Sequence, residues 1–429
     1  MRRLPASFLT ILMIVLALPC EAQRIQPGDL VYRGAFRLPE GSTGTNWEYS
    51  GHAMAYFPEG DPGGRDDGYP GSIFATGHDH QQYVSEISIP APVISPNRRL
   101  DELNTAKTLQ SFQDINDMFG DLEIPCAGLA YLPAQASQSK GKLYFCWGQH
   151  FQFEQVPSHG SCETNLSNPN PSGPWRLDGY SNYVTDDYLF EIPNTWADAN
   201  TPGQCLATGR FREGGWSGRG PALFAFEPWI HDKAPGPNTT LKNLTPLLLY
   251  GMQLPGIPEI QNDDSVGMNG YKACDHWSGG AWLTAGDKSA VVFVGTKALG
   301  RCWYGFANGV VWPIDCTPGG SPPCPDVPDW PNDNRGWWAE DYAAQIIFFD
   351  PMDLAGVAKG TLQPHEPQPY AFLNIDPYLF DPHVDAVRYK RDLVGAVSFD
   401  RTRGLLYVFE RQADGEKSLI HVLGLKTKP

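Results

Sequence analysis

The chain repeats one pattern of apolar and polar positions. A short apolar run opens with Gly or Ala and ends in an aromatic residue. A turn follows, and a second apolar run passes through an aromatic residue and stops at a polar cluster. Clear copies begin at residues 51, 127, 280 and 395. Each copy predicts an antiparallel β-hairpin, because both runs are short, apolar and bounded by turn-forming residues.

A third apolar run follows these hairpins. Most of these third runs are followed by a short segment that begins with Pro. The third runs lie at 83–90, 187–193, 345–351 and 418–422. No stretch longer than about 12 residues keeps a 3.6-residue apolar period. We therefore expect only a turn or two of helix, at 194–199 and 352–358, in an otherwise all-β chain.

Recurring hairpins at long spacing are typical of stacked sheets, and a β-propeller is the usual way to close such sheets. Four copies are clear, and 221–226 with 246–250 suggest another. The remaining length leaves room for one or two more, so we predict a β-propeller of about five to seven blades. A two-domain split or a pair of β-sandwiches is the structural alternative.

The first predicted strand, 29–37, has no hairpin partner beside it, whereas the last copy shows only three strands. Pairing of these N- and C-terminal strands would close the ring and remove the free sheet edges. We therefore predict that the strand at 29–37 pairs with the blade that ends near Val422.

The N-terminus has the features of a secretory signal peptide. Arg2 and Arg3 form a basic region, residues 8–18 an apolar region, and residues 20–22 a small-x-small cleavage site. We expect residues 1–22 to be cleaved, which leaves a single propeller domain at 23–429 in a secreted or periplasmic protein. No later segment approaches the roughly 20 apolar residues of a membrane span.

Two long stretches interrupt the repeat and are predicted to be loop insertions. The stretch at 157–183 is polar and rich in Pro, Asn, Ser and Gly, and the stretch at 313–338 is rich in Pro, Asp and Trp. Stretches this long in a compact fold are usually functional loops or decoration. Trp337 and Trp338 are candidates for stacking on sugar rings, and packing of the loop onto a blade is the alternative.

The cysteines are expected to form disulfides. Of nine cysteines, Cys20 falls in the signal peptide, which leaves an even number in an oxidising compartment. Cys316 and Cys324 bracket a Pro-rich loop and are expected to pair. Cys126 and Cys146 lie on neighbouring predicted strands and are a second candidate pair. The remaining four can pair in three ways, so we predict at least two disulfides without assigning all of them.

The formal net charge of −16 argues against a nucleic-acid or anionic-membrane partner, because both need basic patches. It leaves room for an anionic substrate in a locally basic pocket. We expect a monomer that binds a polysaccharide or another extracellular ligand.

Polar residues recur at matched positions of the repeats. In a propeller the inner strands line the axis, and the loops at one end build the site. We therefore predict that these positions converge on one end of the tunnel. Candidate acid–base residues are His52, His78, His150 and His276. Candidate substrate-binding cations are Lys297, Arg301 and Arg411. For any one histidine, the simpler interpretation is a half-buried side chain bonded to the backbone.

At the level of blade pattern, the mature chain resembles secreted bacterial β-propellers, and it is similar to propeller polysaccharide lyases of the ulvan-lyase type. That resemblance implies His or Tyr as acid and base, with Arg or His neutralising a uronate. A His or Tyr whose pKa lies near the operating pH is suited to such proton transfer. The chain contains no motif by which individual catalytic residues of that family could be matched to positions in this sequence.

Two other function classes fit the same architecture. A propeller glycoside hydrolase needs axial carboxylates, for which Asp79, Asp275 and Glu410 are candidates. A non-catalytic module would bind glycan or protein without a converging acid and base. The chain lacks a G-x-S-x-G elbow, a P-loop, a dinucleotide fingerprint and an H-E-x-x-H motif.

We predict no cofactor, and a bound Ca²⁺ ion is the alternative that the sequence leaves open. The Asp-rich loop at 60–68 resembles a Ca²⁺ loop, but it lacks the EF-hand spacing and the bidentate Glu. Turn formation explains its Asp and Gly residues better.

Overall fold

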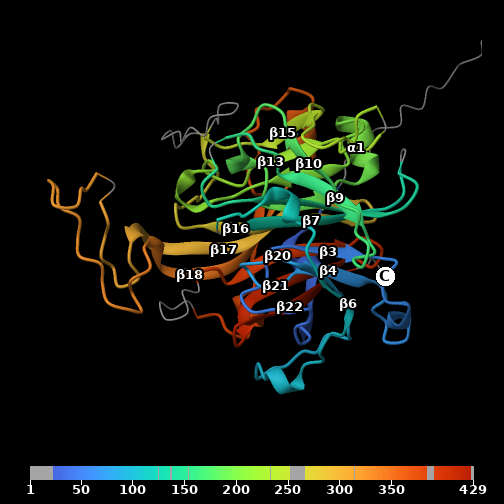
Figure 1. The fold of residues 1–429 in the computed structure, drawn as a ribbon, viewed down its shortest axis with the longest axis horizontal. Helices are drawn as coiled ribbons and strands as arrows, with labels where there is room; N and C mark the ends of the chain where they lie inside the picture. The colour runs from blue at the N-terminus through green and yellow to red at the C-terminus, as the bar shows by residue number, and fades with distance from the viewer. Residues whose placement is uncertain are drawn as a thin grey trace, which may run out of the picture.

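The computed structural model describes residues 23–426 except 124, 136–137, 153, 232, 252–265, 314 and 384–390. The signal peptide expected at 1–22 lies outside these residues. Within the described part, the strands form five sheets arranged as the blades of a β-propeller, with two α-helices packed at its periphery (Figure 1). The all-β prediction is confirmed, and five blades fall within the predicted range.

Each blade is an antiparallel sheet of four main strands. Blade one contains β3 (Met54–Phe57), β4 (Ser72–Thr76), β5 (Val84–Ser88) and β6 (Thr108–Gln113). Blade two contains β7 (Cys126–Leu132), β8 (Lys142–Gly148), β9 (His159–Glu163) and β10 (Ser172–Leu177), with β14 (Thr240–Leu241) at its edge. Blade three contains β11 (Tyr188–Glu191), β12 (Leu206–Gly209), β13 (Leu223–Phe226) and β15 (Leu244–Leu248).

Blade four contains the longest strands. They are β16 (His276–Ala285), β17 (Lys288–Gly305), β18 (Gly336–Phe349) and β19 (Ala371–Asn374), and β1 (Gln23–Arg24) pairs parallel to β17. The helices α1 (Asn194–Asn200) and α2 (Pro351–Ala358) each follow a strand, as the sequence predicts. No helix in the described residues has the length and apolar character to cross a bilayer.

Blade five closes the ring. It contains β20 (Val394–Asp400), β21 (Leu405–Asp414), β22 (Lys417–Leu425) and the N-terminal strand β2 (Leu30–Arg37). β2 runs antiparallel to β22, with Leu30 opposite Leu425 and Arg37 opposite Leu419. The predicted closure by N- and C-terminal strands is confirmed.

The inner strands β3, β7, β11, β16 and β20 contact one another in a ring around the axis. Glycines permit this close approach. A Cβ on Gly280 would lie 2.5 Å from the Phe190 ring, and one on Gly395 would lie 2.1 Å from the carbonyl oxygen of Gly51. The Gly/Ala opening of the sequence repeat therefore reflects convergence of the inner strands on the axis.

Most of the core lies between neighbouring blades. One cluster packs Phe190 and Phe211 of the blade three region against Trp282 and Phe293 of blade four, and another joins blades five and one. Large aromatic side chains such as Trp147 are fully buried. Burial of this apolar surface is the main force that holds the blades together.

Two expectations about strand order were wrong. The run at 187–193, expected to be a third strand, forms β11, the inner strand of blade three. The stretch at 157–183, expected to be a loop insertion, contains β9 and β10, the outer strands of blade two. The residues of β9 and β10 show little of the apolar alternation that marks a strand, so these polar strands carry a weak sequence signal.

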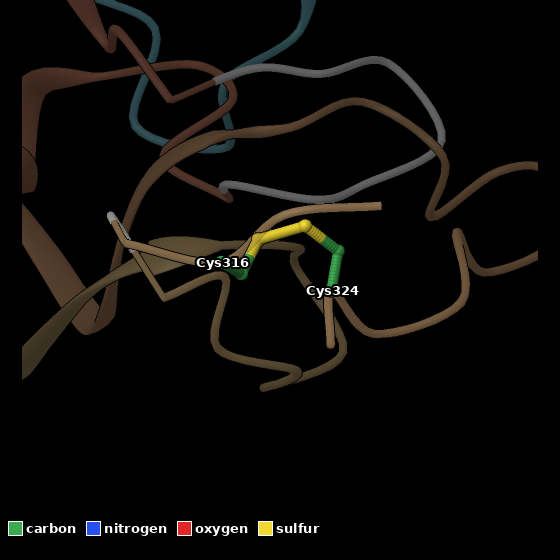
Figure 2. Close-up of a disulfide and its surroundings, with 2 residues drawn as sticks. All are labelled: Cys316 and Cys324. Carbon is green, nitrogen blue, oxygen red and sulfur yellow. A yellow bond between two sulfur atoms is a disulfide. The ribbon is translucent and has the colours of Figure 1, made fainter. Parts of the chain in front are cut away.

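The other predicted insertion, at 313–338, mostly forms an arm between β17 and β18 that projects from the ring (Figure 1). Figure 2 shows the disulfide between Cys316 and Cys324 on this arm, which confirms that pairing. The candidate Cys126–Cys146 pair is not formed, and the described residues contain one disulfide where at least two were predicted. Cys126 lies opposite Gly148, and Cys146 lies opposite Gly128, so the two thiols are diagonal across the β-ladder rather than facing each other.

Candidate active site at one end of the propeller axis

A cavity of about 920 Å³ lies at the end of the axis where the inner strands begin. Every inner strand contributes one residue from its first position or from just before it. These residues are His52, Cys126, Asp187, His276 and Asp392. The inner strands all start at the same face of the ring, so residues at the same repeat position meet there.

The second strand of each blade runs antiparallel to the first and therefore returns to the same end. Asp79 follows β4, His150 follows β8, and Arg212 follows β12, and all three line the cavity. Arg411 lies in the irregular part of β21 and also faces the cavity. This end of the axis thus collects side chains from two positions of the repeat.

A chain of polar contacts links two histidines across the cavity floor. His276 Nδ1 contacts Asp392 Oδ1. Arg411 Nη1 donates to Asp392 Oδ2 at 3.5 Å, and Arg411 Nη2 donates to His52 Nε2 at 3.3 Å. Because the Arg411 guanidinium can only donate, His52 Nε2 accepts this bond and carries no proton.

Charge and burial hold the two histidines in different protonation states. Burial alone lowers the pKa of His276, but the carboxylates of Asp392, Glu213 and Asp187 outweigh it and raise that pKa to about 9. Burial, reinforced by Arg411, holds the pKa of His52 well below its usual range. His276 is therefore an imidazolium at neutral pH, whereas His52 is neutral.

His150 is a second neutral imidazole. Arg212 Nη2 donates to His150 Nε2 at 2.8 Å, and the same guanidinium lies 4.8 Å from the centroid of the Phe151 ring. Burial and the nearby Arg212 charge lower the pKa of His150 to about 4. This imidazole can accept a proton only if Arg212 moves away from Nε2.

The carboxylates of the wall also differ from one another. Burial raises the pKa of Asp187 to about 7, against the opposing charges of Arg210 and His276. The pKa of Glu213 is instead lowered, because His276, Arg212 and Arg391 outweigh its burial. Beneath them, Arg210 Nη1 lies 3.2 Å from Asp186 Oδ1 in a buried ion pair.

The base of the arm forms an aromatic wall. The rings of Tyr304 and Trp337 lie 5.5 Å apart, and the Arg335 guanidinium lies 4.4 Å from the Trp312 ring. Gly214 brings the loop after β12 against this wall: its φ is +79°, and a Cβ there would lie 2.3 Å from Trp337 Nε1. Aromatic faces beside cations are suited to a ring-shaped, anionic ligand.

Several predicted site residues line the cavity, namely His52, His150, His276, Arg411 and Trp337. The other predicted side chains lie elsewhere. His78 Nδ1 lies 3.0 Å from Asp79 Oδ1, and it is Asp79 that lines the cavity. Trp338 is buried beneath the Arg391 guanidinium, which lies 4.8 Å from its ring.

The two remaining predicted cations are held by carboxylates outside the cavity. Lys297 Nζ lies 2.6 Å from Asp275 Oδ1, and Asp275 is fully buried. Arg301 is 61% exposed, lies 3.9 Å from Glu340 and covers the Trp303 ring.

Of the carboxylates considered for hydrolysis, Asp79 alone lines the cavity. Asp275 neutralises Lys297. Glu410 is buried, and it accepts hydrogen bonds from the backbone N–H groups of Phe380 and Asp381 and contacts His421 Nε2 at 2.7 Å. Both side chains hold loops in place.

The residues that sequence reasoning missed are Asp187, Arg212, Glu213, Arg391 and Asp392. Asp187 and Asp392 occupy the same repeat position as His52 and His276, at or just before the start of an inner strand. A correct alignment of all five repeats would therefore have identified them. Blade three lacks the Gly/Ala opening that marks an inner strand, which hid Asp187. Arg212 and Glu213 lie in a loop with no motif.

Among the residues that the structure describes, no cluster of three or more His, Cys, Asp or Glu side chains is arranged to hold a metal ion. In the Asp-rich loop, Asp61 Oδ1 accepts from the N–H of Gly63 at 3.1 Å, and Asp67 Oδ1 accepts from the N–H of Tyr69 at 2.9 Å. These are turn-forming contacts.

Comparison with protein-family models and with curated proteins found no match for this chain.

Proposed function

We propose that this protein is an extracellular enzyme that cleaves a uronate-containing polysaccharide by β-elimination at the axial cavity. A propeller fold is compatible with carbohydrate-active or carbohydrate-binding roles. One observation carries the more specific proposal: a single cavity contains a charged imidazole, His276, and a neutral one, His150. Groups whose environments push their pKa values apart are suited to act as acid and base.

The chemistry assigns a role to each side chain. A substrate carboxylate would draw Arg212 into an ion pair, which neutralises the uronate and releases His150 Nε2. That nitrogen then takes the C5 proton, the C–H electrons form the C4=C5 double bond, and the C4–O bond breaks. The leaving oxygen receives the proton of His276 Nε2, while Asp392 orients the ring through Nδ1.

Binding of the sugar is assigned to the aromatic walls. Trp337 and Tyr304 offer ring faces on the arm, and Phe151 offers a partly exposed ring on the opposite loop. Arg411 and Arg391 supply further positive charge near Asp392. The cavity lining thus holds five arginines beside five carboxylates, whereas the whole chain is acidic.

The test is a screen of uronate-containing polysaccharides, read by the absorbance of an unsaturated uronyl product. We expect product with the wild type, and a loss of about 10²-fold or more in turnover for His150→Ala and for His276→Gln. His78→Ala is the matched control, because His78 follows β4 as His150 follows β8 but does not line the cavity. No unsaturated product from any glycan, with glycan binding retained, would favour the binding-module alternative.

A second candidate is glycoside hydrolysis, favoured by the opposite pKa shifts of two wall carboxylates. Asp187, with its pKa near 7, would serve as the acid, and ionised Glu213 would serve as base or nucleophile. Hydrolysis releases new reducing ends without an unsaturated product. Loss of that activity in Asp187→Asn, with His150→Ala still active, would select this alternative.

A further inference from the structure

We propose that Cys274 and Cys302 form a disulfide in the exported protein and that this bond fixes the base of the arm to the head of β16. The inference is independent of the reaction at the cavity. It concerns how the wall that contains Tyr304 and Trp337 is held in position.

The backbone brings the two cysteines together. Cys274 precedes β16, and its thiol donates to the carbonyl oxygen of Trp338 at 3.0 Å. Cys302 lies in β17 directly opposite Ala339, the residue after Trp338. Both cysteines therefore lie beside the same two residues of β18. Burial and the nearby Cys302 thiol raise the pKa of Cys274, which is consistent with this proximity.

The other free thiols do not share this arrangement. Cys126 and Cys146 are diagonal across their ladder, and the Cys126 thiol donates to the carbonyl of Asp186 at 3.6 Å. Cys162 and Cys205 are buried in two different hydrophobic clusters. Cys316 and Cys324 are already paired with each other on the arm between β17 and β18. Cys274 and Cys302 are therefore the pair expected to oxidise next.

The reaction is thiol–disulfide exchange with an oxidised disulfide, such as glutathione disulfide. Each thiol loses a proton, a sulfur–sulfur bond forms between Cys274 and Cys302, and the two electrons reduce the partner disulfide to thiols. The bond would close a loop of about 30 residues, which restricts the unfolded chain. Because Cys274 lines the cavity and Cys302 lies two residues before Tyr304, the same bond would set the position of the aromatic wall.

Peptide mapping tests the pairing directly. The full mature chain is equilibrated in a glutathione redox buffer until Cys316–Cys324 is completely linked, then unfolded and alkylated without reduction. We expect a linked Cys274–Cys302 peptide and alkylated Cys126, Cys146, Cys162 and Cys205. Alkylated Cys274 and Cys302 in this same sample would overturn the proposal.

Thermal unfolding gives an independent test. In a Cys316→Ser/Cys324→Ser background, reductant should lower Tm by about 5 °C, and adding Cys302→Ser should abolish that response. Cys205→Ser in the same background is the control and should retain the response. Equal behaviour of the Cys302→Ser and Cys205→Ser proteins would contradict the proposed bond.

Discussion

The two ends of the propeller axis are built by the same five strands, yet they differ in chemistry. The inner strands begin at the 920 Å³ cavity with its histidines, arginines and carboxylates. They end at a smaller cavity of about 200 Å³ lined mainly by aromatic and apolar side chains, with Tyr56, Trp282 and Phe399 among them. Between the two ends the axis is nearly closed. Only a cavity of about 10 Å³ remains there, and small residues such as Gly128 and Gly280 are among those that line it.

The two ends also differ in how many charged side chains they hold. At the far end, Arg401 lies 3.2 Å from Glu191, so one cation meets one carboxylate. At the near end, five arginines and five carboxylates line the wall of the 920 Å³ cavity, and two histidines, His276 and His150, are held in opposite protonation states. The backbone is common to both ends, so the difference between them comes from the side chains at the starts and ends of the inner strands.

The largest contrast is expected in turnover. We predict that Asp392→Asn lowers turnover about 10²- to 10⁴-fold, because His276 loses the carboxylate that orients and charges it. Arg401→Gln at the far end should change turnover less than about twofold. Initial rates on a responsive glycan measure both variants, and comparable losses in the two would refute the assignment of the site to one end.

A similar contrast is expected in stability. Asp186→Ala leaves Arg210 charged and buried without its partner, which should cost about 3–5 kcal/mol of unfolding free energy. Glu191→Ala removes a partly exposed partner of Arg401 and should cost less than about 1 kcal/mol. Urea unfolding gives both values. Equal costs would show that the near-end charges are not buried as the structure indicates.

The pH dependence of the unfolding free energy reports the contribution of His276. Its pKa is raised from an ordinary value near 6.5 to about 9 on folding, so its stabilising contribution is complete below about pH 6.5 and is lost as the pH rises through 9. The wild type should therefore lose up to about 3 kcal/mol more than His276→Gln between pH 6 and pH 9.5. Parallel urea curves for the two proteins over this range would contradict the charged state of His276.

The smallest effect is expected where the loop after β12 meets the arm. Gly214→Ala places a Cβ against Trp337 at a backbone conformation with φ of +79°, which should cost about 1–2 kcal/mol. The displaced Trp337 should raise KM more than it lowers kcat. Gly415→Ala is the control: its φ is +67°, but a Cβ there meets nothing. A KM effect of equal size in the control would argue against a role for Trp337 in binding.

Most of the fold could be predicted from the repeat pattern, because inner strands need Gly or Ala where they crowd together at the axis. The pattern predicted the β2–β22 closure, and it placed His52 and His276 at the starts of inner strands. It failed at β11, where Tyr188 and its neighbours have no small-residue opening, and so Asp187 escaped notice. Lys297 and Arg301 could not be judged from sequence, because only the structure shows that carboxylates outside the cavity hold them.

The most direct test of the account is an NMR titration of the histidine ring protons, with His276→Gln, His150→Ala and His52→Ala used for assignment. We predict that His276 titrates near pH 9, that His150 titrates near pH 4, and that His52 stays neutral across the neutral range. Titration of all three rings together near the ordinary pKa of about 6.5 would contradict the claim that this cavity holds a ready acid beside a ready base.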